Sequence, residues 1–446
     1  MQNDNLINFL VDLNNLATSK GASSADSIIV DDTAEQISVR NGKVDQAEYS
    51  RNQTCALRVF VGKKHAMVST SDFDKTSMDT LVERAISMAK EAPEDNFSRI
   101  AESHEITKIN HELELFDDTK ISQEKMKELA LRAENSAYEI EGVTNSDGAN
   151  FSQNKSYFAL ATTNGFVKSS ASSNFAISCS VVAGKDQAME TDYDFSSKRF
   201  FTDLSQPEKI GQTAGIRALT KLNPKKIQTF EGPVLFPNRF ASSLISQFAG
   251  SINGATIARG TSFLKNEFNK QIFDSNINIY DDPLIKRGVV SRSFDAEGLE
   301  CRKTTIVERG VLKSWLLDIR SANQLGLAST AHASRGISTN PYPTNSNFYL
   351  EPSKTTIDEL VAGIKKGIII TGLFGGGVNI LTGNFSQGAS GLYVENGEIM
   401  FPVSEFTIAS NLKDMFKSMQ IANDLEMKYA INSPSVLIEK MTIAGT

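Results

Sequence analysis

The chain has 446 residues, of which 40% are apolar and 22% charged, and it carries a formal net charge of −7. This length and composition predict a globular protein of two or three domains, and an acidic chain without a long Lys/Arg block is not expected to bind nucleic acid directly. Every apolar run is shorter than the roughly 20 residues of a membrane helix, and the opening Met1–Leu6 segment lacks the order of a signal peptide. We therefore expect a cytoplasmic protein that binds no membrane.

The first half of the sequence alternates between helical and strand patterns. Apolar residues at helical spacing predict helices at 5–20, 78–89, 122–140 and 207–222. β-prone runs predict strands at 27–30, 36–39, 55–61, 157–162, 166–168 and 175–183. Asn41-Gly42 and Asn164-Gly165 are expected to join neighbouring strands as hairpins. The result is an antiparallel sheet covered by helices.

After a lysine-rich stretch at 221–226, the sequence becomes richer in strands, glycine and proline. Strands are predicted at 232–236, 277–280, 304–308, 311–317 and 368–371. Helices are predicted at 239–252, 356–366 and 411–426. We therefore predict an α+β protein with an N-terminal α+β domain at 1–226 and a mostly β C-terminal domain with a few helices at 227–446.

Residues 372–397 hold eight of the chain's 29 glycines between two apolar segments. Glycine allows positive φ and the close approach of another backbone, so this density predicts either bulges and turns around a groove or a kinked sheet without a ligand. The run ends at Asn396-Gly397, which is a strong hairpin signal. Gly375-Gly376-Gly377 precedes neither Lys-Ser/Thr nor a helix, so the phosphate-loop and dinucleotide fingerprints are not met.

Few side chains offer metal-binding or nucleophilic chemistry. His104 and His111 would lie roughly 10 Å apart along a helix, too far to share one metal ion without a bend, so we expect a solvated polar segment. His332 stands in a loop of small residues, where a structural or solvent-facing role is expected. The cysteines never form Cys-x-x-Cys and are expected to be buried apolar residues; they are Cys55, Cys179 and Cys301.

Four carboxylates flank predicted turns, where such side chains commonly cap the backbone. They are Asp281, Asp282, Asp295 and Glu297. An acid–base pair would need the two turns to meet, and nothing in the sequence brings them together. The Gly-x-Ser-x-Gly pattern of a serine nucleophile does not occur.

Several motifs together resemble the TldD/PmbA family. The longest spans 377–391 and is followed by matching segments at 394–399, 402–405 and 407–412. Further matches lie at 163–166, 192–194, 260–264, 294–298 and 441–445. The similarity covers nearly the whole chain, and within the family the sequence is similar to the PmbA branch, also called TldE.

The resemblance implies a metal-dependent peptidase built as a heterodimer of a TldD-type and a PmbA-type subunit. In the TldD branch a helix carries His-Glu-x-x-x-His, and a C-terminal cysteine adds a metal ligand. The matching positions here are Ser246, Gln247 and Ser251, and residues 423–446 contain no cysteine. Neutral hydroxyl and amide groups are weak metal ligands, and glutamine cannot act as a general base. The resemblance therefore implies no catalytic residue and no metal in this chain, with zinc or iron in the TldD-type partner.

From this resemblance we expect a subunit that completes a peptide cleft around the partner's metal. A glycine-rich sheet edge lets an extended peptide approach closely. The candidate cleft wall consists of Gly375, Gly376, Gly377, Asn379, Gly383, Gly388 and Gly391. Two alternatives stay open: an independent metallopeptidase with atypical ligands such as His332, and a non-catalytic regulator of the gyrase-modulator type. The sequence leaves the oligomeric state of the isolated chain open, with a homodimer as one possibility.

Overall fold

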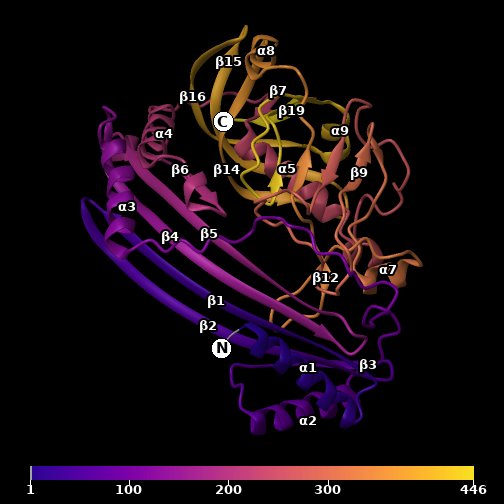
Figure 1. Cartoon of the computed structure of the whole chain (residues 1–446). Helices are drawn as coiled ribbons and strands as arrows, with labels where there is room; N and C mark the ends of the chain where they lie inside the picture. The colour runs from indigo at the N-terminus through magenta and orange to yellow at the C-terminus, as the bar shows by residue number, and fades with distance from the viewer. Residues whose placement is uncertain (1–2, 446) are drawn as a thin grey trace.

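The computed structural model describes residues 3–445, so the first two residues of the opening segment lie outside it. A six-stranded antiparallel sheet of order β3-β2-β1-β4-β5-β6 forms the first half of the molecule (Figure 1). Its strands are β1 (Ser24–Arg40), β2 (Lys43–Val61), β3 (Lys64–Thr70), β4 (Val143–Thr162), β5 (Val167–Ala183) and β6 (Glu190–Lys198). The runs predicted separately at 27–30 and 36–39 thus belong to one strand. The Asn41-Gly42 hairpin is confirmed, with φ of 52° and 75° at its two residues.

Helices cover one face of this sheet, as predicted. They are α1 (Asn3–Ser19), α2 (Lys75–Glu91), α3 (Gln123–Tyr138) and α4 (Pro207–Leu219). α1 and α2 lie against one end of the sheet and α3 and α4 against the other (Figure 1). Ile29 of β1 packs in the core under α1 and α2, and Ile37 packs in the core under α3 and α4. Both point to the same face, because side chains an even number of residues apart lie on one side of a strand. On the opposite face, Ile28 and Leu160 contact Phe294 of the second half.

The second half contains a sheet that closes on itself. Strands β16, β15, β14, β7 and β19 follow one another, and β16 pairs again with β19, where Ile408 faces Ile443. The strands of this sheet are β7 (Phe230–Phe236), β14 (Lys366–Val378), β15 (Asn384–Glu395), β16 (Glu398–Asn411), β17 (Met419–Ile421) and β19 (Val436–Ala444). Helix α5 (Asn238–Ser251) buries Leu244, Ile245 and Phe248 in the core that this sheet surrounds.

Shorter elements complete the second half around a five-stranded sheet of order β10-β9-β8-β13-β18. The short strands are β8 (Ile279–Asp281), β9 (Thr304–Glu308), β10 (Val311–Leu312), β11 (Ala333–Ser334), β12 (Tyr342–Pro343), β13 (Phe348–Leu350) and β18 (Ile431–Asn432). The short helices are α6 (Gly254–Ala258), α7 (Ile319–Leu325), α8 (Ile357–Ala362) and α9 (Leu412–Lys417). The helix predicted at 411–426 is wrong beyond Lys417, because the chain leaves α9 to form β17 beside β19.

The α+β class with a β-rich second half is as predicted. The predicted boundary at 226/227 falls between α4 and β7, in a stretch where Lys225 donates its N–H to Pro402 of β16 at 2.8 Å. The division into two domains stays a prediction. No helix within residues 3–445 is long and apolar enough to span a membrane.

Candidate functional site

Helix α5 carries the positions that the resemblance matches to metal ligands. It follows β7 directly, and its buried apolar face fixes which side chains point elsewhere. Ser246 is exposed, Gln247 is half-buried and Ser251 is buried. The Ser251 hydroxyl donates to the backbone carbonyl of Gln247 at 2.7 Å, and the Ser251 carbonyl accepts from the Ser262 hydroxyl at 2.6 Å. Ser251 is therefore occupied in holding the end of the helix.

The side chains at these positions do not fit a zinc or iron ion. Two hydroxyls and one amide are neutral oxygen and nitrogen donors, whereas such ions are held by imidazole, thiolate and carboxylate groups. Across residues 3–445, His, Cys, Asp and Glu side chains form no group of three placed to hold a metal. Because the donor chemistry does not fit, no step of a reaction on this chain is assigned to a metal.

The glycine-rich run forms the hairpin of β14 and β15, and its tip reaches the end of α5. The strand register shifts between Phe374 and Gly377, which marks a bulge. A Cβ on Gly376, whose φ is 53°, would lie 2.3 Å from the Ser386 carbonyl oxygen, so the bulge requires glycine there.

At the tip, the Ile380 carbonyl accepts the N–H of Phe263 at 2.9 Å. The Ile380 side chain comes within 4.0 Å of where a Cβ on Gly250 would lie. The structure therefore brings the tip of the hairpin next to the turn of α5 that contains Gln247 and Ser251.

The predicted cleft-wall residues differ in their exposure to solvent, and therefore in whether a ligand could reach them. Gly375, Gly376 and Asn379 are exposed, Gly377 and Gly388 are half-buried, and Gly383 and Gly391 are buried. The Asn379 side chain accepts the N–H groups of Leu381 and Thr382, which shapes the tip of the hairpin. Exposed Phe374 and Leu381 give the same hairpin an apolar surface. The role of these residues as a cleft wall stays a prediction.

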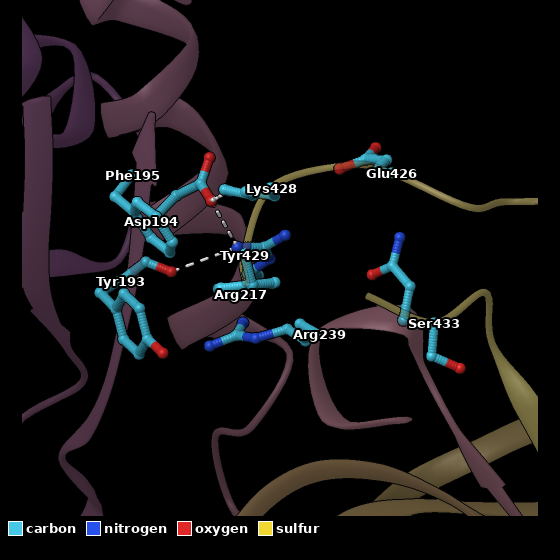
Figure 2. Close-up of a pocket in the computed structure, with 10 residues that line it drawn as sticks. Tyr193, Asp194, Phe195, Arg217, Arg239, Glu426, Lys428, Tyr429 and Ser433 are labelled. Carbon is cyan, nitrogen blue, oxygen red and sulfur yellow. Dashed lines mark hydrogen bonds and ion pairs between the residues drawn. The ribbon is translucent and has the colours of Figure 1, made fainter. Parts of the chain in front are cut away.

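An ionic cluster on β6 ties the N-terminal sheet to the second half of the molecule, and Figure 2 shows the part of it around Asp194. Asp192 and Asp194 of β6 each bind two cations at distances between 2.7 and 3.1 Å. These cations are Arg217, Lys221, Arg239 and Lys428. Although burial raises it, the hydrogen bond from Lys221 and the charge of Arg239 hold the pKa of Asp192 below its ordinary value.

Arg239 stands at the start of α5 and also lies over the ring of Tyr193, 4.9 Å from its centre. The space that the cluster encloses is about 30 Å³, room for a water molecule or two. We therefore interpret residues 192–194 as a joint between the two halves of the molecule. The sequence marked these residues as part of the family resemblance but gave them no role.

His332 and Ala333 together link the two carboxylate turns that the sequence left unconnected. Nε2 of His332 lies 3.2 Å from Oδ1 of Asp281, and its Nδ1 lies 2.9 Å from Oγ1 of Thr330. The next residue, Ala333, donates its N–H to Asp295 at 3.2 Å. Both His332 and Asp281 are buried, so of the two expected roles of His332 the structure favours the structural one.

The second turn holds two buried carboxyl groups with raised pKa values. Burial raises the pKa of Asp295 despite hydrogen bonds from the Leu299 and Glu297 N–H groups. For Glu297, burial and then the charges of Asp295 and Asp318 raise the pKa well above 4.5. The Glu297 carboxylate accepts the N–H of Ile319 at 2.8 Å at the start of α7. Capping of the backbone, as predicted, is what these side chains do.

The other histidines do not converge. His104 and His111 lie in an irregular segment, where His104 is exposed and Nε2 of His111 is 3.7 Å from Glu300. His65 is on β3, where burial lowers its pKa. Burial also raises the pKa of all three cysteine thiols to about 12, in agreement with the predicted burial of Cys55, Cys179 and Cys301.

Comparison with known proteins agrees with this architecture. Models of the PmbA/TldA metallopeptidases match domain 1 at 25–89, the central domain at 113–222 and the C-terminal domain at 229–445. A metalloprotease PmbA homolog from Haemophilus influenzae is 35% identical over 96% of this chain and 94% of its own length. Metalloprotease PmbA from Escherichia coli O157:H7 is 32% identical over the same shares.

A solved structure from Bacteroides thetaiotaomicron, described as a proposed modulator of DNA gyrase, superposes with a TM-score of 0.92 at 24% identity over 100% of both chains. The three successive domain matches point to a family of metallopeptidases. The chain belongs to the PmbA/TldD metalloprotease family.

Proposed function

We propose that this chain is the PmbA-type subunit of a cytoplasmic two-chain metalloprotease whose TldD-type partner supplies the metal. The observation that carries the proposal is the polar face of α5, where Ser246, Gln247 and Ser251 occupy the matching positions of the metal-binding helix. The relatives named PmbA, aligned over 96% of the chain, support the choice of branch. Zinc or iron is expected in the partner, and peptides or unfolded segments are the expected substrates.

In this proposal the hairpin of β14 and β15 forms part of the peptide cleft. Its tip lies beside α5, and its exposed face combines apolar side chains with backbone that carries no Cβ at Gly375 and Gly376. An extended peptide could therefore approach the strand closely and pair with it through backbone hydrogen bonds.

The test is to purify this chain, a TldD-type chain from the same organism and the pair, and to measure metal content and cleavage of an unfolded protein by each. Cleavage by the pair, with the metal in the partner and no activity in this chain alone, is the expected result. Stoichiometric metal and chelator-sensitive cleavage by this chain alone would instead identify an independent metallopeptidase. Capture of gyrase by this chain, with no TldD-type chain bound and no cleavage, would favour the regulatory alternative.

A further inference from the structure

A cleft of about 530 Å³ lies between the two halves of the molecule, away from the residues of α5 described above. Its walls come from β4 and β5, from the segment 110–116, and from loops at 291–296 and 333–335. This volume is typical of sites that bind small molecules or a few residues of a peptide.

One part of the cleft is apolar. Phe158 of β4 and Phe294 of the second half face each other with ring centres 6.4 Å apart. Leu113, Leu115 and Phe116 of the segment that crosses between the halves add to the lining. A flat or branched apolar side chain would lose its contact with water on entering this part of the cleft.

The other part of the cleft is lined by three basic residues. Nε of Arg292, Nε of Arg335 and Nε2 of His111 are buried and have no hydrogen-bond partner within residues 3–445. The Arg335 side chain is 0% exposed. A guanidinium remains protonated at ordinary pH, so each buried Nε needs an acceptor that the described chain does not supply.

The charges around the cleft are consistent with an anionic ligand group. Arg335 shares its partner Asp26 with Arg58, so two guanidinium groups bind one carboxylate. Asp295 is the carboxylate that lines the cleft, and its two oxygens already accept the backbone N–H groups of Glu297, Leu299 and Ala333. Glu300 lies 3.7 Å from Nε2 of His111, so Arg292 is the residue of the three that is available to an added carboxylate.

We propose that this cleft binds the terminal carboxylate and the apolar last side chain of a peptide. The carboxylate accepts hydrogen bonds from the half-buried Arg292, and the side chain packs against Phe158 and Phe294. Its use as a substrate anchor rests on the proposed function, but the binding itself requires neither a partner chain nor cleavage.

The test is calorimetric titration of the full chain with Gly-Gly-Phe, its C-terminal amide, free phenylalanine and inorganic phosphate. Gly-Gly-Phe is expected to bind, and the amide to bind about tenfold to a hundredfold more weakly, because it loses charge-assisted hydrogen bonds. Arg292→Gln should weaken Gly-Gly-Phe by a similar factor. Arg84→Gln, an exposed arginine of α2, is the matched control and should bind as the wild type does.

Ser169→Asp provides a second variant, because Ser169 lines the cleft on β5 and a carboxylate there would repel the ligand. Thermal melts check that each variant folds. Equal binding of Gly-Gly-Phe and its amide, or unchanged binding in a folded Arg292→Gln or Ser169→Asp, would overturn the proposal. Binding of phosphate or free phenylalanine in place of Gly-Gly-Phe would also overturn it, since it would identify another ligand. A failed cleavage assay with intact peptide binding would count only against the proposed function.

Discussion

Asp26 of β1 forms a buried ion pair that joins the two halves of the molecule. Arg58 of β2 donates to it through Nε at 2.8 Å, and Arg335 of the second half donates through Nη1. All three side chains are at most 4% exposed. Asp26→Asn keeps the shape of the side chain but leaves two buried guanidinium groups without a counterion. Breaking a buried ion pair from one side costs about 3–5 kcal/mol, so we expect a loss of that size in the free energy of unfolding.

Urea unfolding at neutral pH, followed by circular dichroism, measures this loss. Asp31→Asn is the control, because Asp31 lies on the same strand and binds Arg51 at 3.1 Å, but the Arg51 side chain is 54% exposed. An ion pair in contact with water contributes about 0–1 kcal/mol, so the control should stay within about 1 kcal/mol of the wild type. A loss below about 1 kcal/mol for Asp26→Asn, or equal losses for both variants, would refute the reasoning.

The pH dependence of the same variant gives an independent check. Burial raises the pKa of Asp26, but the charges of Arg58 and Arg335 outweigh burial and hold the pKa below 3.8. A carboxyl with a lowered pKa in the folded state stabilises the protein fully above its unfolded pKa of about 3.9, and this contribution disappears as pH falls through the folded pKa. The difference between the wild type and Asp26→Asn should therefore shrink in acid.

Three further predictions concern buried groups. Because the raised pKa of Glu297 favours its neutral form, its stabilising contribution holds below pH 4.5 and is lost as pH rises through that raised pKa. Glu297→Gln should therefore gain stability relative to the wild type in urea titrations as pH rises above 4.5, and a constant difference would contradict this. Gly376→Ala should lower the midpoint of thermal unfolding more than Gly375→Ala does. Both glycines have a left-handed φ, 53° at Gly376 and 55° at Gly375, but only a Cβ at 376 would meet a backbone oxygen. Equal midpoints of the two variants would argue against this close approach. The thiols should react with a disulfide reagent only after unfolding, and rapid reaction of the native protein would contradict the burial of Cys55, Cys179 and Cys301.

Elements that depend on local chemistry could be predicted from the sequence. The helices α1 to α4 follow from apolar residues at helical spacing, and the Asn41-Gly42 and Asn396-Gly397 hairpins follow from residues that tolerate positive φ. The length of β1 could not be predicted, because residues 31–35 are mostly polar and lack alternation. They remain in a strand because β2 and β4 pair with them on both sides. The end of α9 is another case, since pairing of β17 with β19 overrides the helical pattern.

The candidate site was predictable in part for a similar reason. Ser246, Gln247 and Ser251 could be placed on a helix from spacing alone, but their proximity to the hairpin tip depends on residues more than a hundred positions away. The link between Asp26 and Arg335 spans 309 residues, and no pattern along the chain indicates it. Contacts of this kind follow from how the two halves are assembled, which single-sequence reasoning does not supply.

The packing of helix α5 can hold the fold of this family in place without metal-binding side chains on the helix. Leu244, Ile245 and Phe248 bury the helix inside the closed sheet, and Arg239 in its first turn binds Asp192 of β6. None of these contacts uses Ser246, Gln247 or Ser251, so under the proposed function these positions can differ from a metal-binding set without loss of the fold. The motif at 192–194 contacts this helix through Asp192 and Arg239, and the bulge at Gly376 lies in the hairpin whose tip reaches the end of α5. This arrangement is what the proposed function requires, in which the chain shapes a cleft and a partner supplies the reacting groups.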